Sequence, residues 1–406
     1  MTAQHATDAL TAAGHARAMA GYIRDGEGRA MALGNRGTIK LDGDGNLDAA
    51  ILEAYWRTGF YVLEGVINGA ELAELRADVA RVLAGAPVSS DADCDKGGKQ
   101  AIGHDFALAP YGWARPLSDP LGGTAKNKGR HPVKMLDPAV PEGAPEWTIE
   151  RLRGNLQLMD SCLHLYGHPG LLAVVEAVLG PNFVPYNEVV FIKEPGLGPS
   201  VAWHQDGITH WDAADWDHGA HGFNFMAQLH PSTAGNGVWV LPGSHKLGKM
   251  DIRQLVADSG SERIEGAVPL LCGAGDVFIC NRQLVHGSFA NSSLDRRITL
   301  NAGFFPRPGS RCHHLETGRH GGHVYGGKNL RTLPHHRPGR GSPSATFSRG
   351  AAIHLPAAGR PGRRQPLERT NPRNLDQRSQ SSRLLYLKHE LRRHGTTSQG
   401  WWRRHS

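Results

Sequence analysis

Two separated segments of this chain carry side chains that could bind one metal ion together. His204 and Asp206 lie two residues apart in a segment reading Val-Ala-Trp-His-Gln-Asp-Gly at 201–207, and His286 follows much later in the chain. Side chains at positions i and i+2 of an extended chain point to the same side, so the first two residues could share an ion. Two histidines and one carboxylate can occupy one face of an octahedral Fe(II) and leave three positions open. These three residues are therefore candidate ligands of a catalytic iron.

Spacing alone does not single out this pair, because the chain contains 23 histidines. The same spacing recurs at His210 and Asp212, and a glutamate version occurs at His314 and Glu316. The contexts differ, since His204 follows an expected strand and a Pro/Gly turn, whereas His210 lies in a segment rich in Trp and Asp. Context therefore favours the first pair.

Four motifs together carry a family resemblance. They read Trp-His-Gln-Asp-Gly at 203–207, Asn-Gly-Val-Trp-Val-Leu-Pro-Gly-Ser-His at 236–245, Gly-Ala-Gly-Asp-Val at 273–277, and His-Gly-Ser at 286–288 followed by two arginines at 296–297. From about Gly59 to Phe305 the chain resembles the phytanoyl-CoA dioxygenase family of Fe(II)/2-oxoglutarate-dependent oxygenases. That resemblance implies an α+β fold with a double-stranded β-helix (jelly-roll, cupin-like) core and flanking N-terminal helices.

The resemblance also implies what each motif binds. It places Fe(II) on the three candidate ligands, and it places the C5 carboxylate of 2-oxoglutarate on Arg297, with Ser288 as a second contact. A planar guanidinium can hold a carboxylate by two parallel hydrogen bonds, which suits that role. Arg296 would point to the opposite face of the strand and is the second choice. Fe(II), 2-oxoglutarate and O₂ are the implied cofactor and cosubstrates.

Several other residues are candidates for contact with the substrate. Trp203, His210 and Trp211 could form a lid or a wall beside the iron, or they could belong to a surface loop anchored by its aromatic rings. Gln157 and Lys193 could face the site from neighbouring strands, or they could only satisfy local backbone groups.

Hydrophobic periodicity places helices first and strands second. The expected helices cover 47–57, 70–83, 147–166 and 170–179. The expected strands cover 59–67, 184–193, 223–230, 237–241, 268–271, 276–280 and 297–305. Residues 86–145 are rich in Gly, Pro, Asp and Lys and are expected to pass over the surface. Helices followed by short strands without intervening helices are typical of an α+β protein with an antiparallel sandwich or barrel.

Composition limits the class of protein. A chain of 406 residues, 39% of them hydrophobic, suffices for one domain of roughly 250–300 residues with additional segments. No apolar run approaches the roughly 18 residues of a membrane span, and the N-terminus lacks a signal-peptide profile. The five cysteines show no disulfide spacing, so we expect reduced thiols and a cytoplasmic location.

Positive charge is concentrated in the last quarter of the chain. Residues 311–406 hold 19 Lys and Arg against four Asp and Glu, whereas residues 1–310 hold 26 against 34. The acidic body shows no basic stripe, so nucleic acid is not the expected partner. The resemblance implies a small-molecule substrate, and no membrane partner is expected. We divide the chain into a loosely held polar arm at 1–45, a dioxygenase domain at 46–310 and a basic tail at 311–406.

The tail is rich in Arg, His, Pro, Gly and Ser and has little apolar periodicity. One interpretation is a disordered basic tail. The other is a single-base slip between about codons 310 and 334, because a shifted reading frame over 334–341 permits an amphipathic helix. Sequencing the coding DNA distinguishes the two. We assign no function to the tail.

These observations lead to one functional hypothesis and two alternatives. The first is a 2-oxoglutarate-dependent dioxygenase that hydroxylates a small or medium organic substrate and releases succinate and CO₂. The alternatives are a catalytically silent jelly-roll binding protein and a cupin-like metalloenzyme without a cosubstrate. The acidic body and the segment rich in Asp and Trp hint at a cationic or aromatic substrate, and the oligomeric state is left open.

Overall fold

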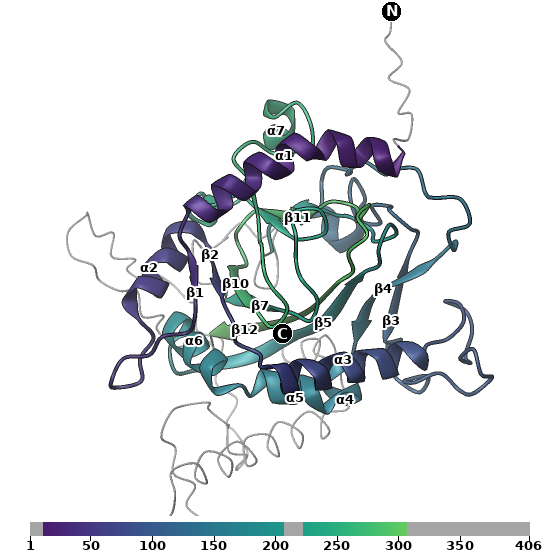
Figure 1. Ribbon diagram of the computed structural model, residues 1–406, viewed down its shortest axis with the longest axis horizontal. Helices are drawn as coiled ribbons and strands as arrows, with labels where there is room; N and C mark the ends of the chain where they lie inside the picture. The colour runs from purple at the N-terminus through teal and green to yellow at the C-terminus, as the bar shows by residue number, and fades with distance from the viewer. Residues whose placement is uncertain (1–10, 207–221, 307–406) are drawn as a thin grey trace, which may run out of the picture.

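The computed structural model describes residues 11–206 and 222–306 (Figure 1). Its helices are α1 (Ala12–Ala32), α2 (Ala49–Thr58), α3 (Gly69–Ala84), α4 (Asn155–Leu158), α5 (Asp160–Tyr166), α6 (Pro169–Leu179) and α7 (Ile252–Asp258), with short 3-10 turns η1 (Lys126–Gly129) and η2 (Ser244–Lys246). Its strands are β1 (Arg36–Gly37), β2 (Phe60–Leu63), β3 (Tyr111–Ala114), β4 (Thr148–Arg153), β5 (Phe183–Lys193), β6 (Val201–His204), β7 (Phe223–Gln228), β8 (Trp239–Val240), β9 (Val268–Pro269), β10 (Val277–Asn281), β11 (His286–Ser288) and β12 (Arg297–Pro306).

From β5 onward the strands are shared between two sheets. The larger sheet contains the order β10-β7-β12-β5, and the smaller sheet has the order β6-β11-β8-β9. All pairings within these two groups are antiparallel. Chain segments that switch between two facing sheets in this way form a double-stranded β-helix, so the expected jelly-roll fold is confirmed. β1 and β2 extend one edge of the larger sheet, and β4 and β3 extend the other.

Three hydrophobic clusters hold the layers together. The largest lies between the larger sheet and the helices on its outer face and includes Tyr55 of α2, Val174 of α6 and Leu300 of β12. A second fills the space between the sheets, with Phe278 from the larger sheet and Val240 from the smaller. The third covers the outer face of the smaller sheet. Figure 1 shows the result, with α1 and α7 on one side of the sheets and α3 to α6 on the other.

Helix α1 corrects the expectation of a loosely held arm at 1–45. Tyr22 stacks on Trp239 of β8 with ring centroids 4.4 Å apart, and its hydroxyl donates to the Ile264 carbonyl at 2.8 Å. Met19 is buried in the same cluster. The local sequence did not indicate this packing, because only a narrow stripe of α1, with His15, Met19 and Gly26, is buried.

The expected helix at 147–166 is also corrected in its first half. Residues Thr148–Arg153 form β4, which pairs with β5 through Leu152 and Val190. Helix α4 begins at Asn155 and helix α5 at Asp160. The open edge of the larger sheet provides hydrogen-bond partners for this segment, and tertiary pairing of that kind overrides local propensity.

The other expected elements agree with the structure to within a few residues. Asn68 caps α3 and forms a capping box with Glu71, which accounts for the clear start of that helix. Within the described residues, no single helix is long and apolar enough to cross a membrane, although α5 and α6, bent by 47°, pass that test as a pair.

Candidate metal centre

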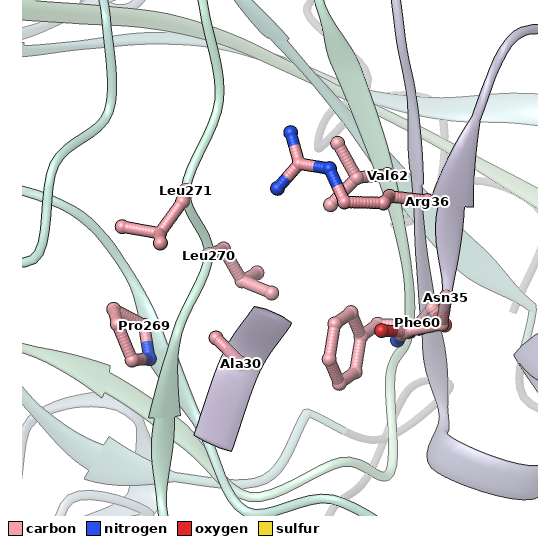
Figure 2. Close-up of a pocket in the computed structure, with 8 residues that line it drawn as sticks. All are labelled: Ala30, Asn35, Arg36, Phe60, Val62, Pro269, Leu270 and Leu271. Carbon is pink, nitrogen blue, oxygen red and sulfur yellow. Dashed lines mark hydrogen bonds between the residues drawn. The ribbon is translucent and has the colours of Figure 1, made fainter. Parts of the chain in front are cut away.

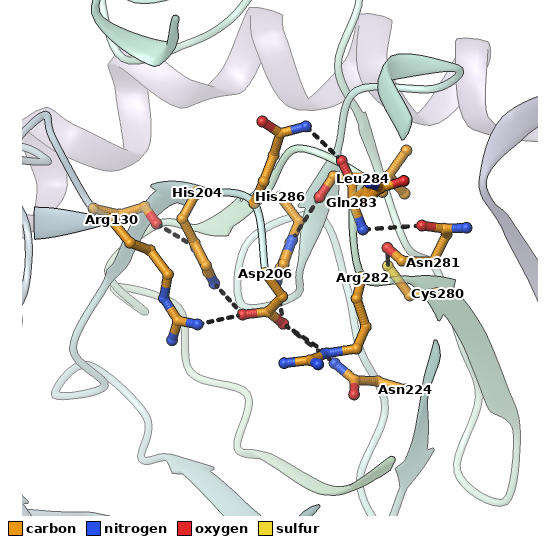
Figure 3. A network of polar contacts seen from close by, with 12 residues as sticks. Arg130, His204, Asp206, Asn224, Cys280, Asn281, Arg282, Gln283, Leu284 and His286 are labelled. Carbon is orange, nitrogen blue, oxygen red and sulfur yellow. Dashed lines mark hydrogen bonds and ion pairs between the residues drawn. The ribbon is translucent and has the colours of Figure 1, made fainter. Parts of the chain in front are cut away.

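His204 and His286 are cross-strand neighbours. His204 ends β6 and His286 begins β11, and the antiparallel register places them directly opposite each other, with ring centroids 4.1 Å apart. Asp206 follows β6 and reaches the same point (Figure 3). Its oxygens lie 3.8 Å from Nε2 of His204 and 3.9 Å from Nε2 of His286. One ligand atom from each residue lies within 4.8 Å of the other two.

Backbone carbonyls orient both imidazoles. Nδ1 of His204 donates to the Ala202 carbonyl at 2.8 Å, and Nδ1 of His286 donates to the Leu284 carbonyl at 2.8 Å. A carbonyl can only accept, so each proton resides on Nδ1 and each Nε2 lone pair faces Asp206. Outer hydrogen bonds of this kind fix the tautomer and ring orientation of histidines that bind metals.

The three side chains hold the protonation states that a metal requires. Burial lowers the pKa of His204 and of His286 below the ordinary value, so both rings are neutral at pH 7. Burial alone would raise the pKa of Asp206, but Arg130 and Arg282 outweigh it and hold that pKa well below its usual range. Two neutral imidazoles and one carboxylate form the donor set of a non-heme Fe(II) site.

Arg297 provides a test of whether 2-oxoglutarate fits. It starts β12 opposite Lys193 of β5, it is 3% exposed, and its Nη1 donates to the Asn236 carbonyl at 3.0 Å. Its Nε is buried without a hydrogen-bond partner, and no carboxylate of the described residues lies within ion-pair distance of it. A buried, unpaired guanidinium needs an anion. A ligand carboxylate fits that need.

The neighbouring arginine lies in a different environment. Arg296 is exposed, and its Nε and Nη2 both lie 2.8 Å from the Glu194 carboxylate. Adjacent side chains point to opposite faces of a strand, so Arg297 is buried, whereas Arg296 pairs with Glu194 in solvent. Ser288 is buried on β11, two residues after His286.

Lys193 is buried opposite Arg297. It was expected to face the site and contact a substrate. Its Nζ donates to the Phe289 carbonyl, and burial together with the charge of Arg297 lowers the pKa of Lys193 far below its ordinary value. This backbone bond is the alternative that the sequence left open. Contact between Lys193 and a substrate stays a prediction.

Two expected substrate contacts are wrong. Trp203 is completely buried on the face of β6 opposite His204, where its Nε1 donates to the Glu262 carbonyl at 2.6 Å. Successive residues of a strand point to opposite faces, so Trp203 and His204 cannot both line the metal centre. Gln157 is exposed on α4, on the helix-covered side of the larger sheet. His210 and Trp211 lie outside the described residues.

Sequence reasoning missed four residues at this centre. Arg130 Nη1 donates to Asp206 Oδ1 at 2.8 Å, and Asn224 Nδ2 donates to Oδ2 at 3.4 Å. Arg282 Nε lies 4.0 Å from the same Oδ2, and the His131 ring lies 4.3 Å from the His204 ring. Arg130 and His131 come from the stretch at 86–145 that was expected to pass over the surface. No motif marks them, because only the folded loop brings them to β6.

The pocket shown in Figure 2 lies away from the metal centre. Its lining comes from α1, β1, β2 and β9 with their adjoining loops, including Arg36, Phe60 and Leu270. It has room for no more than about one water molecule. It is therefore too small to bind an organic substrate.

The sequence profile of the family described as phytanoyl-CoA dioxygenase (PhyH) matches residues 55–299. This chain belongs to the phytanoyl-CoA dioxygenase family. The match includes all three candidate metal ligands and Arg297. Membership makes the chain an enzyme of the Fe(II)/2-oxoglutarate-dependent dioxygenase class, with Fe(II) as its cofactor and 2-oxoglutarate and O₂ as its cosubstrates.

Three solved structures resemble parts of this family member. EctD from S. alaskensis, crystallised with 2-oxoglutarate and 5-hydroxyectoine, is 19% identical, with a TM-score of 0.45 over 66% of this chain and 79% of its own. AviO1 from Streptomyces viridochromogenes Tue57 is 21% identical, with a TM-score of 0.44 over 68% and 99%. SnoN, an alpha ketoglutarate dependent epimerase from nogalamycin biosynthesis, is 18% identical, with a TM-score of 0.42 over 64% and 84%. No curated protein sequence matches the chain.

Proposed function

We propose that this protein hydroxylates a small or medium organic substrate and releases succinate and CO₂ from 2-oxoglutarate. In this proposal His204, Asp206 and His286 bind Fe(II). Arg297 holds the C5 carboxylate of 2-oxoglutarate, with Ser288 beside it. The observation that carries the proposal is the convergence of two neutral imidazoles and one ionised carboxylate in the same interior as a buried guanidinium without a carboxylate partner.

The residues of the chain perform three tasks. The carbonyls of Ala202 and Leu284 keep both Nε2 atoms directed at the metal position. Arg297 fixes the far end of the cosubstrate and thereby its angle at the metal. The apolar cluster between the sheets, which includes Phe278 and Val240, excludes water. When bound, iron would bind O₂, and 2-oxoglutarate would supply two of the electrons that activate it for oxidation of the substrate.

Succinate release from 2-oxoglutarate tests the proposal. The purified chain with Fe(II), O₂ and 2-oxoglutarate should release succinate, even slowly without a prime substrate. His204→Ala and Asp206→Ala should each abolish release, because two ligands cannot hold the site. His164→Ala, which removes an exposed histidine of α5, is the matched control and should leave the rate unchanged.

Succinate release at the wild-type rate in either ligand variant would contradict the metal assignment. The same assay separates the alternatives, since neither a silent binding protein nor a cosubstrate-free metalloenzyme consumes 2-oxoglutarate.

A further inference from the structure

Two arginines lie against the single carboxylate of Asp206. Arg130 Nη1 donates to Oδ1 at 2.8 Å, and Arg282 Nε lies 4.0 Å from Oδ2. The Nε of Arg130 is buried without a hydrogen-bond partner. Asp206 is also the one carboxylate within ion-pair distance of Arg130 in the ranges 11–206 and 222–306. Within these ranges Arg130 therefore depends on Asp206 alone for a carboxylate partner.

A bound divalent ion would compete with Arg130 for the carboxylate of Asp206, which is one of the candidate metal ligands. The carboxylate would then be shared with the metal, which weakens its bond to Arg130. A partly desolvated guanidinium is stable beside a metal when an anionic ligand pairs with it.

The loop that carries Arg130 is held firmly in place. Asp119 accepts hydrogen bonds from the backbone of Gly122 and of Met135, both at 2.8 Å, and Gly123 donates to the His131 carbonyl at 2.9 Å. His131 itself packs on the His204 ring and keeps a buried Nδ1 without a partner. Both neighbouring residues thus present unused donor or acceptor atoms beside the triad.

We propose that Arg130 binds a carboxylate of a ligand that sits next to the metal, exchanging its bond to Asp206 for a bond to that ligand. The inference rests on the proposed function. The carboxylate can come from the metal-binding end of 2-oxoglutarate or from a prime substrate that is an organic acid. The chemistry is the same in both cases, a two-point guanidinium–carboxylate pair. A carboxylic-acid substrate would replace the cationic or aromatic one suggested by composition.

Calorimetric binding of 2-oxoglutarate to the full chain loaded with Mn(II) tests the first source. In Arg130→Gln the affinity should fall about 10- to 100-fold, as expected for a lost charge-assisted hydrogen bond. Arg130→Lys keeps the charge without the planar fork and should give a smaller loss. Arg115→Gln is the control, because Arg115 is an exposed arginine of the same stretch, 3.6 Å from Glu146. It should bind as the wild type does.

A matched pair of ligands tests the second source. Phenylacetate and its neutral amide, phenylacetamide, are titrated into the chain loaded with Mn(II) and 2-oxoglutarate. If the substrate is the source, the wild type binds phenylacetate more tightly than the amide, Arg130→Gln loses this preference, and the affinity for 2-oxoglutarate is unchanged.

The proposal is wrong if neither 2-oxoglutarate nor phenylacetate binding depends on Arg130. It is also wrong if Arg130→Gln weakens only Mn(II) binding, because Arg130 would then serve solely to position Asp206. If Arg130→Gln does not fold, the same titrations of 2-oxoglutarate and phenylacetate are made with Arg130→Lys, and their result decides whether the proposal holds. A wild-type chain that binds neither Mn(II) nor 2-oxoglutarate would contradict the proposed function instead.

Discussion

At the scale of single residues, the metal centre depends on groups that are buried before a ligand arrives. Each histidine donates Nδ1 to the backbone carbonyl two residues before it, so its orientation does not depend on a bound ion. Asp206 is kept ionised by arginines rather than by solvent. The site is thus organised in advance, which reduces the cost of ordering side chains when a metal binds.

Arg297 is expected to strengthen 2-oxoglutarate binding while lowering the stability of the ligand-free chain. Replacing it with Met should weaken 2-oxoglutarate binding about 10- to 100-fold, because charge-assisted hydrogen bonds are lost. The same change should leave the thermal stability of the ligand-free chain equal or higher, since it removes a buried charge without a carboxylate partner. Calorimetry and thermal unfolding measure the two effects.

Arg296→Met is the control for this prediction. It removes an exposed ion pair with Glu194, which is worth little, and should change neither quantity. An unchanged 2-oxoglutarate affinity in Arg297→Met, with a loss in Arg296→Met, would move the anchoring role to Arg296.

At the scale of elements, α1 covers the outer face of the smaller sheet through a close contact. A Cβ placed on Gly26 would lie 2.5 Å from the Trp239 ring, whereas a Cβ on Gly28 would have no neighbour within 4 Å. Gly26→Ala should therefore destabilise the protein by about 1–3 kcal/mol through overpacking. Gly28→Ala should stabilise it by about 0.5–1 kcal/mol, because alanine favours the helix. Chemical denaturation measures both, and equal effects would show that α1 does not pack on β8.

Strand β5 carries a carboxyl group whose pKa depends on the covering helices. Burial raises the pKa of Glu188 to about 7. The hydrogen bond that Glu188 accepts from the Leu156 backbone lowers this pKa, but by less than burial raises it. Between the ordinary glutamate pKa and about 7, the folded chain holds a proton that the unfolded chain has lost. The free energy of unfolding therefore decreases as pH rises through this range, by up to about 3 kcal/mol.

Thermal unfolding at pH 5 and pH 8 tests this dependence. Glu188→Gln cannot ionise, so its stability relative to the wild type should increase from pH 5 to pH 8. Glu53→Gln on α2 replaces an exposed carboxylate and should show no such trend. Parallel pH curves for Glu188→Gln and the wild type would mean that Glu188 titrates normally.

At the scale of the whole molecule, the proposed catalytic domain at 46–310 is expected to function without the tail. Strand β12 completes its pairing with β5 at Pro306 and Phe183, and the triad and Arg297 all lie before that point. A chain that ends after Ser310 should therefore bind Mn(II) and 2-oxoglutarate as the full chain does, measured by calorimetry. Loss of binding would show that residues 311–406 belong to the functional unit.

The sequence, through its family motifs, was sufficient to predict the three candidate metal ligands, Arg297 and most of the jelly-roll strands, although β6 was not among them. Ligands two residues apart on an extended chain must share a face, and strand periodicity is visible over a few residues. Only the tertiary structure decided that Trp203 points away from the iron position, that β4 joins the larger sheet, and that α1 packs on Trp239. It alone also placed Arg130 and His131 beside Asp206 and His204. These contacts join segments far apart in the chain, and no local pattern encodes which distant surface a polar helix or loop will meet.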